Sequence, residues 1–90
     1  MTSIVVAVRD VKLGEYGQLV TVTNGNVAIR SFGDMVEKGD NPFAAHPEDY
    51  QLYQLGIYDN VKGRVDNLLV PELLCSASDF IKLKSTTVQN

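Results

Sequence analysis

The spacing of apolar and polar residues predicts two strands, one helix and two further strands along the chain. Residues 4–8 form a β-branched apolar run, which is typical of a strand buried on both faces. Residues 18–23 have high β-propensity and predict a second strand. Gly14 and Gly17 lie in the polar stretch 10–17, which we expect to be a turn or loop. The two strands are close enough in sequence to form a hairpin.

Residues 26–38 have the spacing of an amphipathic helix, whose apolar face comprises Ala28, Ile29, Phe32, Met35 and Val36. Asn24 and Gly25 precede this segment and are suited to capping its N-terminus. Gly39 follows it and suits the left-handed position that ends many helices. Gly33 weakens the middle of the helix by about 1 kcal/mol relative to alanine. We therefore expect Gly33 to mark a close packing contact.

The second half begins with a loop over residues 40–49, which holds two prolines, and continues as a strand over residues 50–58. Simple alternation gives this strand two faces, one with Tyr50, Leu52 and Tyr58 and the other with Tyr53, Leu55 and Ile57. A turn at residues 59–63 is followed by Arg64 and Val65, which begin a returning strand. These elements predict a second hairpin.

Beyond residue 65 the pattern is less regular, and the mixed apolar spacing between 66 and 82 assigns no element. Pro71 either ends the returning strand or lies at a sheet edge, because proline cannot donate to a ladder. The order β-β-α-β-β predicts an α+β fold, a small antiparallel sheet with one covering helix. We expect one domain over residues 1–84 and a flexible polar tail over residues 85–90.

The composition of the chain argues against some classes of function. The 90 residues include eight basic and eleven acidic ones, giving a formal net charge of −3. This balance argues against a strongly basic nucleic-acid-binding protein but allows a local basic patch. A domain of this size is marginally stable alone, so we expect a homodimer or small homo-oligomer. We find no signal peptide and no apolar run approaching about 20 residues, which predicts an intracellular protein outside the membrane.

Catalysis and metal binding find little support in the sequence. His46 is the single histidine and lies close to Glu48 and Asp49. A general base of this kind needs a nucleophile, but Cys75 lies in an apolar context and no serine has an elbow motif. One histidine and two acids form a thin metal-ligand set. We therefore predict that the chain is not an enzyme and binds neither a metal nor a cofactor. We interpret His46 and its neighbours as shaping the entry to the following strand.

Aromatic residues provide the strongest binding signal. Tyrosines on a sheet face can stack on unpaired bases, and the candidates here are Tyr50, Tyr53 and Tyr58, with Tyr16 and Phe43 nearby. Phosphate contacts could come from Arg30, Lys62 and Arg64, or from Arg9 and Lys12. The alternative interpretation is that most of these tyrosines belong to the core or to a dimer interface.

Several segments resemble one known family. The central motif is His46-Pro47-Glu48-Asp49-Tyr50, followed by Leu52, Leu55, Gly56 and Asp59. Weaker matches are Asp10-Val11-Lys12 with Tyr16, then Ala28-Ile29-Arg30-Ser31-Phe32, and finally Pro71, Leu74, Ala77 and Phe80. Together they resemble the small nonstructural protein of gokushovirus-type microviruses (Microviridae). The chain departs from the pattern at Val20, Gln54 and Cys75.

This resemblance implies a nonstructural phage protein that binds single-stranded DNA during genome synthesis or packaging, in the host cell cytoplasm. It implies no catalytic residue, and it leaves residues such as Gly56 with structural roles. The alternative is a protein–protein interaction module that acts on a host or viral replication factor without touching DNA. Its acidic surface would suit a basic partner.

Overall fold

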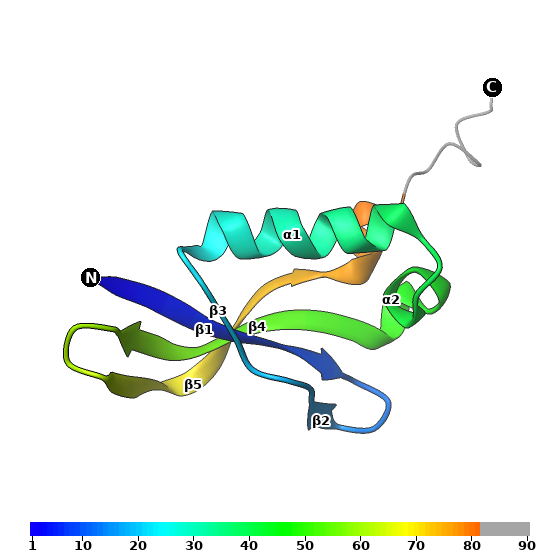
Figure 1. The fold of residues 1–90 in the computed structure, drawn as a ribbon. Helices are drawn as coiled ribbons and strands as arrows, with labels where there is room; N and C mark the ends of the chain where they lie inside the picture. Colours follow the sequence, from blue (N-terminus) through cyan, green and yellow to red (C-terminus); the bar gives the residue numbers. More distant parts are fainter. Residues whose placement is uncertain (82–90) are drawn as a thin grey trace.

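The computed structural model of the chain describes residues 1–81; the predicted tail and the last residues of the predicted domain lie outside the described part. An antiparallel sheet and one main helix confirm the predicted α+β fold (Figure 1). The strands are β1 (Thr2–Asp10), β2 (Glu15–Tyr16), β3 (Val20–Val22), β4 (Tyr50–Asp59) and β5 (Arg64–Ser76). The helices are α1 (Gly25–Lys38), α2 (Pro42–Ala45) and two 3-10 turns, η1 (Pro47–Asp49) and η2 (Ala77–Phe80).

The sheet is built around β1, which pairs with β4 on one side and with both β2 and β3 on the other. The pairing of Ile4 with Val22 confirms the predicted first hairpin. Because β3 and β4 are both antiparallel to β1, they are parallel to each other. Helix α1 joins them across β1 and covers one face of the sheet (Figure 1), which is a split β-α-β arrangement.

Helix α1 forms where the apolar periodicity predicts it and is capped as predicted. The Asn24 side-chain oxygen accepts a hydrogen bond from the Val27 N–H at 3.0 Å. Gly39 has a positive φ of 79°, but its ψ of −173° lies outside the left-handed helical region. A β-carbon on Gly33 would lie 2.6 Å from the Phe80 ring, which confirms the expected close contact.

The core lies between α1 and the sheet. Helix α1 contributes three side chains that are at most 3% exposed, Ala28, Phe32 and Val36. The sheet contributes Val6 and Leu52, and the chain's closing segment contributes Cys75 and Ala77. These residues come from elements far apart in sequence, so the core holds together both halves of the chain.

The faces predicted for β4 are wrong, because β4 contains a bulge. Val5 pairs with Gly56 but the next residue, Val6, pairs with Gln54, which leaves Leu55 as an extra residue. Directly paired residues point to the same face, so the extra residue reverses the alternation beyond it. Tyr53 and Tyr58 therefore share one face, and Tyr50 belongs to the other.

Strand β5 accounts for most of the stretch that the sequence left unassigned, and its bulges explain the irregular pattern. Gln54 and Gly56 of β4 pair with Glu72 and Asn67, so residues 68–71 leave the ladder. Pro71 lies within this edge strand rather than at its end. The two strands approach closely, because a β-carbon on Gly56 would lie 2.6 Å from the backbone oxygen of Asp66.

The predicted loop at residues 40–49 contains two short helical turns, α2 and η1. Asn41 caps α2 by accepting from the Ala44 N–H at 2.9 Å, and its amide donates to the Met35 carbonyl at 2.8 Å. These bonds fix the path between α1 and β4. None of the helices within residues 1–81 combines the length and apolar character that crossing a bilayer requires.

Candidate nucleic-acid interface

The sheet face opposite α1 carries a group of aromatic and aliphatic side chains, which we call the open face. Strand register assigns to it Val5, Ala7, Arg9, Tyr16, Tyr53, Tyr58, Val65 and Leu73. Val5 and Ala7 are only 6% and 2% exposed, so they form the floor between taller neighbours. Tyr53 and Tyr58 are half-buried, and Tyr16 is 40% exposed. Aromatic rings on this face thus stand over an apolar floor while part of their surface remains accessible.

Arg9, Tyr16 and Tyr53 form a cluster of contacting side chains on the open face. The Tyr16 and Tyr53 rings meet edge to face, with centroids 5.6 Å apart. The Arg9 guanidinium lies 5.7 Å from the centroid of the Tyr16 ring, in cation–π range. Its Nε is buried and has no hydrogen-bond partner among residues 1–81, and no described carboxylate forms an ion pair with it. The cluster therefore holds a positive charge that the described chain does not neutralise.

Charge is divided between the two faces of the sheet. The carboxylates on the strands are Asp10, Glu15, Asp59, Asp66 and Glu72, and register assigns all five to the α1 side. The open face carries none of them, and its charged residue is Arg9. The formal net charge of −3 therefore does not describe the electrostatic environment of the open face.

Tyr50 lies on the α1 side, apart from the other predicted site tyrosines. Its ring packs against Phe43 with centroids 5.0 Å apart and belongs to the rim of the core. Partial burial raises the pKa of its hydroxyl, and the negative charges of Asp10 and Asp49 raise it further. This environment disfavours a further anion, so Tyr50 is poorly placed to contact a phosphate.

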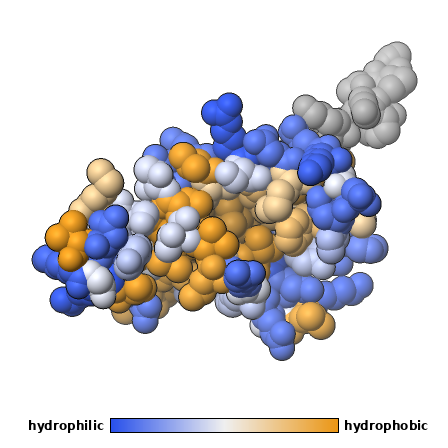
Figure 2. Space-filling view, in the orientation of Figure 1, coloured by the Kyte–Doolittle hydropathy of each residue, from blue (hydrophilic) through white to orange (hydrophobic). Residues whose placement is uncertain are grey.

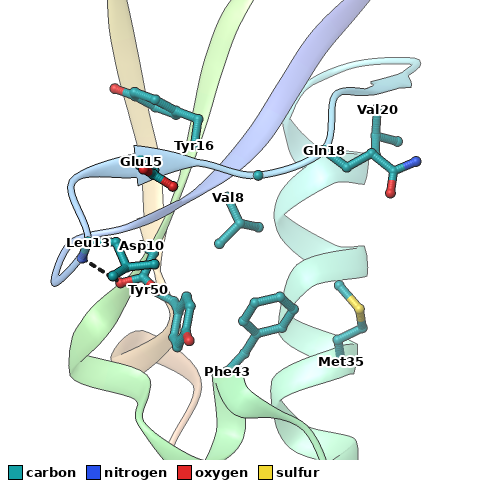
Figure 3. Close-up of a pocket in the computed structure, with 11 residues that line it drawn as sticks. Val8, Asp10, Leu13, Glu15, Tyr16, Gln18, Val20, Met35, Phe43 and Tyr50 are labelled. Atoms are coloured by element: carbon teal, nitrogen blue, oxygen red, sulfur yellow. Dashed lines mark hydrogen bonds between the residues drawn. The ribbon is translucent and has the colours of Figure 1, made fainter.

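Beside Tyr50 lies a cleft between α1, α2 and the β1–β2 turn (Figure 3). Its volume is about 480 Å³, and its walls include Val8, Met35, Phe43 and Tyr50. Asp10 and Glu15 supply its charges, and no basic side chain lines it. We call it the acidic cleft. A smaller apolar depression of about 120 Å³ adjoins it, and Figure 2 shows apolar surface gathered below α1 in this region.

The predicted phosphate contacts are dispersed. Arg30 is exposed on α1, and Lys62 lies in the turn between β4 and β5. The Arg64 guanidinium forms an exposed ion pair with Asp66 at 2.9 Å, on the α1 side of the sheet. The structure therefore brings Arg9, rather than this predicted trio, to the tyrosines.

The motif around His46 joins α2 to the start of β4. Its N–H donates to the Pro42 carbonyl at 2.9 Å, and its own carbonyl accepts from the Asp49 N–H at 3.0 Å. The Asp49 carbonyl accepts from the Val11 N–H at 2.8 Å, which ties this turn to the end of β1. These contacts favour the structural interpretation of His46-Pro47-Glu48-Asp49.

The same motif brings three potential metal ligands together. Ligand atoms of His46, Glu48 and Asp49 lie within 4.8 Å of one another. His46 and Glu48 are exposed, and within residues 1–81 the group comprises these three residues alone. Exposed acidic groups are common at turns, and nothing else in the geometry assigns an ion to them.

Cys75 lies in the core, where it is 9% exposed. Burial raises the pKa of its thiol to about 11, and the charge of Asp79 adds to the effect. The thiol is therefore protonated near neutral pH, which makes it a poor nucleophile.

Comparison with known proteins adds the family context. Residues 3–80 match a protein family described as Phage ORF5 protein. Protein ORF5 of Chlamydia phage 1 is 36% identical over 62 residues, which cover 64% of this chain and 65% of that relative. The matched region therefore spans slightly less than two thirds of the relative's length. No solved structure matches the chain.

Proposed function

Because this chain belongs to the phage ORF5 protein family, we propose that it is a non-enzymatic accessory protein that binds single-stranded DNA through the open face. The family match and the gokushovirus relative confirm the resemblance to a microvirus nonstructural protein. The proposed setting is genome synthesis or packaging in the cytoplasm of the host cell. The DNA-binding role itself is an inference from the side chains of the open face.

The observation that carries this proposal is that three of the four tyrosines share one sheet face with an unneutralised arginine: Tyr16 and Tyr53 lie in the Arg9 cluster, and Tyr58 lies farther along β4. Sheets with exposed aromatic rings bind single strands because each unpaired base offers a face for stacking, worth about 1–3 kcal/mol. Tyr16, Tyr53 and Tyr58 supply such rings. Arg9 supplies a guanidinium that can meet a phosphate oxygen, and no strand carboxylate shares its face.

Fluorescence anisotropy of a labelled single-stranded oligonucleotide tests the proposal, with a duplex of the same sequence for comparison. We expect saturable binding that prefers the single strand and weakens as salt increases. The informative variant is Arg9→Gln, and Arg30→Gln is its matched control because it removes the same charge from the outer surface of α1.

Arg9→Gln should weaken binding and lower the slope of log affinity against log salt by about 0.7, the value for one phosphate contact on a single strand. Arg30→Gln should leave both quantities nearly unchanged. Circular dichroism establishes that each variant is folded. Absence of binding at low salt, or equal losses in the two variants, would refute DNA binding by the open face.

A second candidate function, protein–protein interaction, is favoured by the acidic cleft. Its apolar walls and two carboxylates suit an apolar segment that carries a lysine or arginine. A host or viral replication factor with such a segment is the proposed partner. Purified phage replication proteins can be tested against immobilised wild-type chain and a Met35→Asp variant. Binding that Met35→Asp abolishes, without any affinity for DNA, would favour this function over the first.

A further inference from the structure

The outer edge of β5 presents an apolar protrusion, residues 68–71. These residues leave the ladder because five steps along β5, from Asn67 to Glu72, oppose two along β4. Leu69 is 100% exposed and Val70 is 70% exposed. The order β2-β1-β4-β5 makes β5 an edge strand, so neither side chain is covered by a neighbouring strand.

The protrusion is the centre of a longer apolar strip. Val65 and Leu73, at its two ends, are 55% and 48% exposed. Monomeric proteins rarely expose contiguous apolar patches beyond a few hundred Å², and edge strands are commonly protected by charged side chains. No charged residue lies between Asp66 and Glu72. The protrusion itself therefore carries no charged side chain to oppose association with another apolar surface.

We propose that this strip is the contact surface of a homodimer, in which the β5 edges of two copies meet antiparallel about a two-fold axis. A two-fold axis perpendicular to the sheet at Val70 makes an edge strand antiparallel to its own copy, so each Val70 faces Val70 of the second copy and each Leu69 lies opposite Pro71. Counting outward from the axis, Asp66 then lies opposite Leu74 of the second copy, and Glu72 opposite Leu68. No carboxylate faces another, so the strip is complementary to itself in charge as well as in apolarity.

The same features limit assembly to two copies. Pro71 has no N–H to donate, and the bulge interrupts the spacing of a continuous ladder. Contact is therefore made mainly by side chains rather than by sheet extension. An isologous contact uses the same surface on both copies, so it is saturated in the dimer. The burial also stabilises a domain whose size makes it marginal alone.

Sedimentation equilibrium in the absence of DNA tests this proposal independently of the proposed function. The variants are Leu69→Asp, which places a charge at the centre of the strip, and Val61→Asp, a matched control. Val61 is 79% exposed but lies in the β4–β5 turn, outside the strip. We expect a wild-type dimer whose dissociation constant rises at least about a hundredfold with Leu69→Asp, since two apolar side chains are lost per dimer. Val61→Asp should leave it unchanged.

A cysteine placed on the axis gives a second readout. Val70→Cys should form a disulfide-linked dimer rapidly under mild oxidation, whereas Lys62→Cys, in the distant turn, should not. The native Cys75 is buried and does not interfere. A wild-type chain that stays monomeric at high concentration would overturn the proposal. So would a dimer equally sensitive to both aspartate variants, or equal cross-linking of both cysteine variants. Loss of DNA binding alone would not overturn the proposed dimer.

Discussion

Tyr53 and Tyr58 project from the same face of β4, although five sequence positions separate them and an unbroken strand would set them on opposite faces. The bulge at Leu55 produces this relationship, because it adds one residue between the pairs formed with Val5 and Val6. Two rings therefore lie along one side of the sheet, about 13 Å apart by the rise of four residues on β1. That spacing gives the open face room for more than one base.

Substitution of the open-face tyrosines should affect DNA affinity, whereas substitution of Tyr50 should not. We expect Tyr53→Leu and Tyr58→Leu each to weaken binding to a single-stranded oligonucleotide about 5- to 150-fold, because each removes one stacking platform. Tyr50→Leu is the matched control: it should lower stability, through its contact with Phe43, and leave DNA affinity nearly unchanged. Anisotropy titrations on the folded variants measure these effects. A larger affinity loss in Tyr50→Leu than in the other two would contradict the assignment.

Gly56→Ala should destabilise the fold by about 1–3 kcal/mol, because its β-carbon would overlap the Asp66 backbone oxygen and force the two strands apart. Gly17→Ala is a suitable control, since its β-carbon would lie 3.5 Å from the Val8 oxygen, an ordinary contact distance. Urea denaturation measures the free energy of unfolding of both variants. Equal stability of Gly56→Ala and wild type would show that β4 and β5 can separate without cost.

Asn24→Ala should lower the free energy of unfolding by about 1 kcal/mol, because the Val27 N–H loses its side-chain acceptor. Asn26→Ala, two residues on, removes an exposed asparagine that has no capping role and replaces it with a better helix former. That control should be neutral or slightly stabilising. Thermal unfolding of the two variants and of the wild type measures the effect. An equal loss of stability in both variants would argue against a capping role of Asn24.

The Cys75 thiol should react slowly and affect stability at alkaline pH. Its pKa is raised from 9.0 to about 11, so at pH 8 its thiolate fraction is about a hundredfold below that of an unperturbed thiol. The unfolded chain deprotonates near pH 9 and the folded chain does not. Stability from this group is therefore complete below pH 9 and is lost as pH rises toward 11.

Two measurements check this prediction. A thiol reagent should label native Cys75 far more slowly than the chain in denaturant. Wild type should also lose more stability than Cys75→Val between pH 9 and 11. Fast labelling of the native protein would mean that the thiol is accessible and that the core opens readily around it.

The parts of the fold that depend on local patterns could be predicted from the sequence. Helix α1 was predicted within one residue at its start, because its apolar spacing, its Asn24 cap and the following Gly39 all agree. The start of β4 at Tyr50 is also predictable, because a strand pattern follows directly on the proline-bearing loop. Its face assignment was wrong because alternation assumes an unbroken ladder, and the isolated Gly56 was the available signal of a bulge.

Features that depend on pairing between distant segments could not be predicted. Residues 68–71 gave no regular pattern because they leave the ladder, so β5 was not recognised beyond its first residues. Arg9 was one of several possible phosphate contacts, and nothing local singles it out. Its place in the proposed site follows from register, which sets it beside Tyr16 and on the face without strand carboxylates.

Nuclear magnetic resonance of tyrosine-labelled protein can show whether single-stranded DNA binds to the open face, as we propose. The chain has four tyrosines, so their ring signals can be assigned by single Tyr→Phe substitutions. Addition of an unlabelled oligothymidine should change the chemical shifts of the ring signals of Tyr16, Tyr53 and Tyr58. The ring signals of Tyr50 should stay unchanged. No change at saturating oligonucleotide, or a change confined to Tyr50, would contradict DNA binding by the open face.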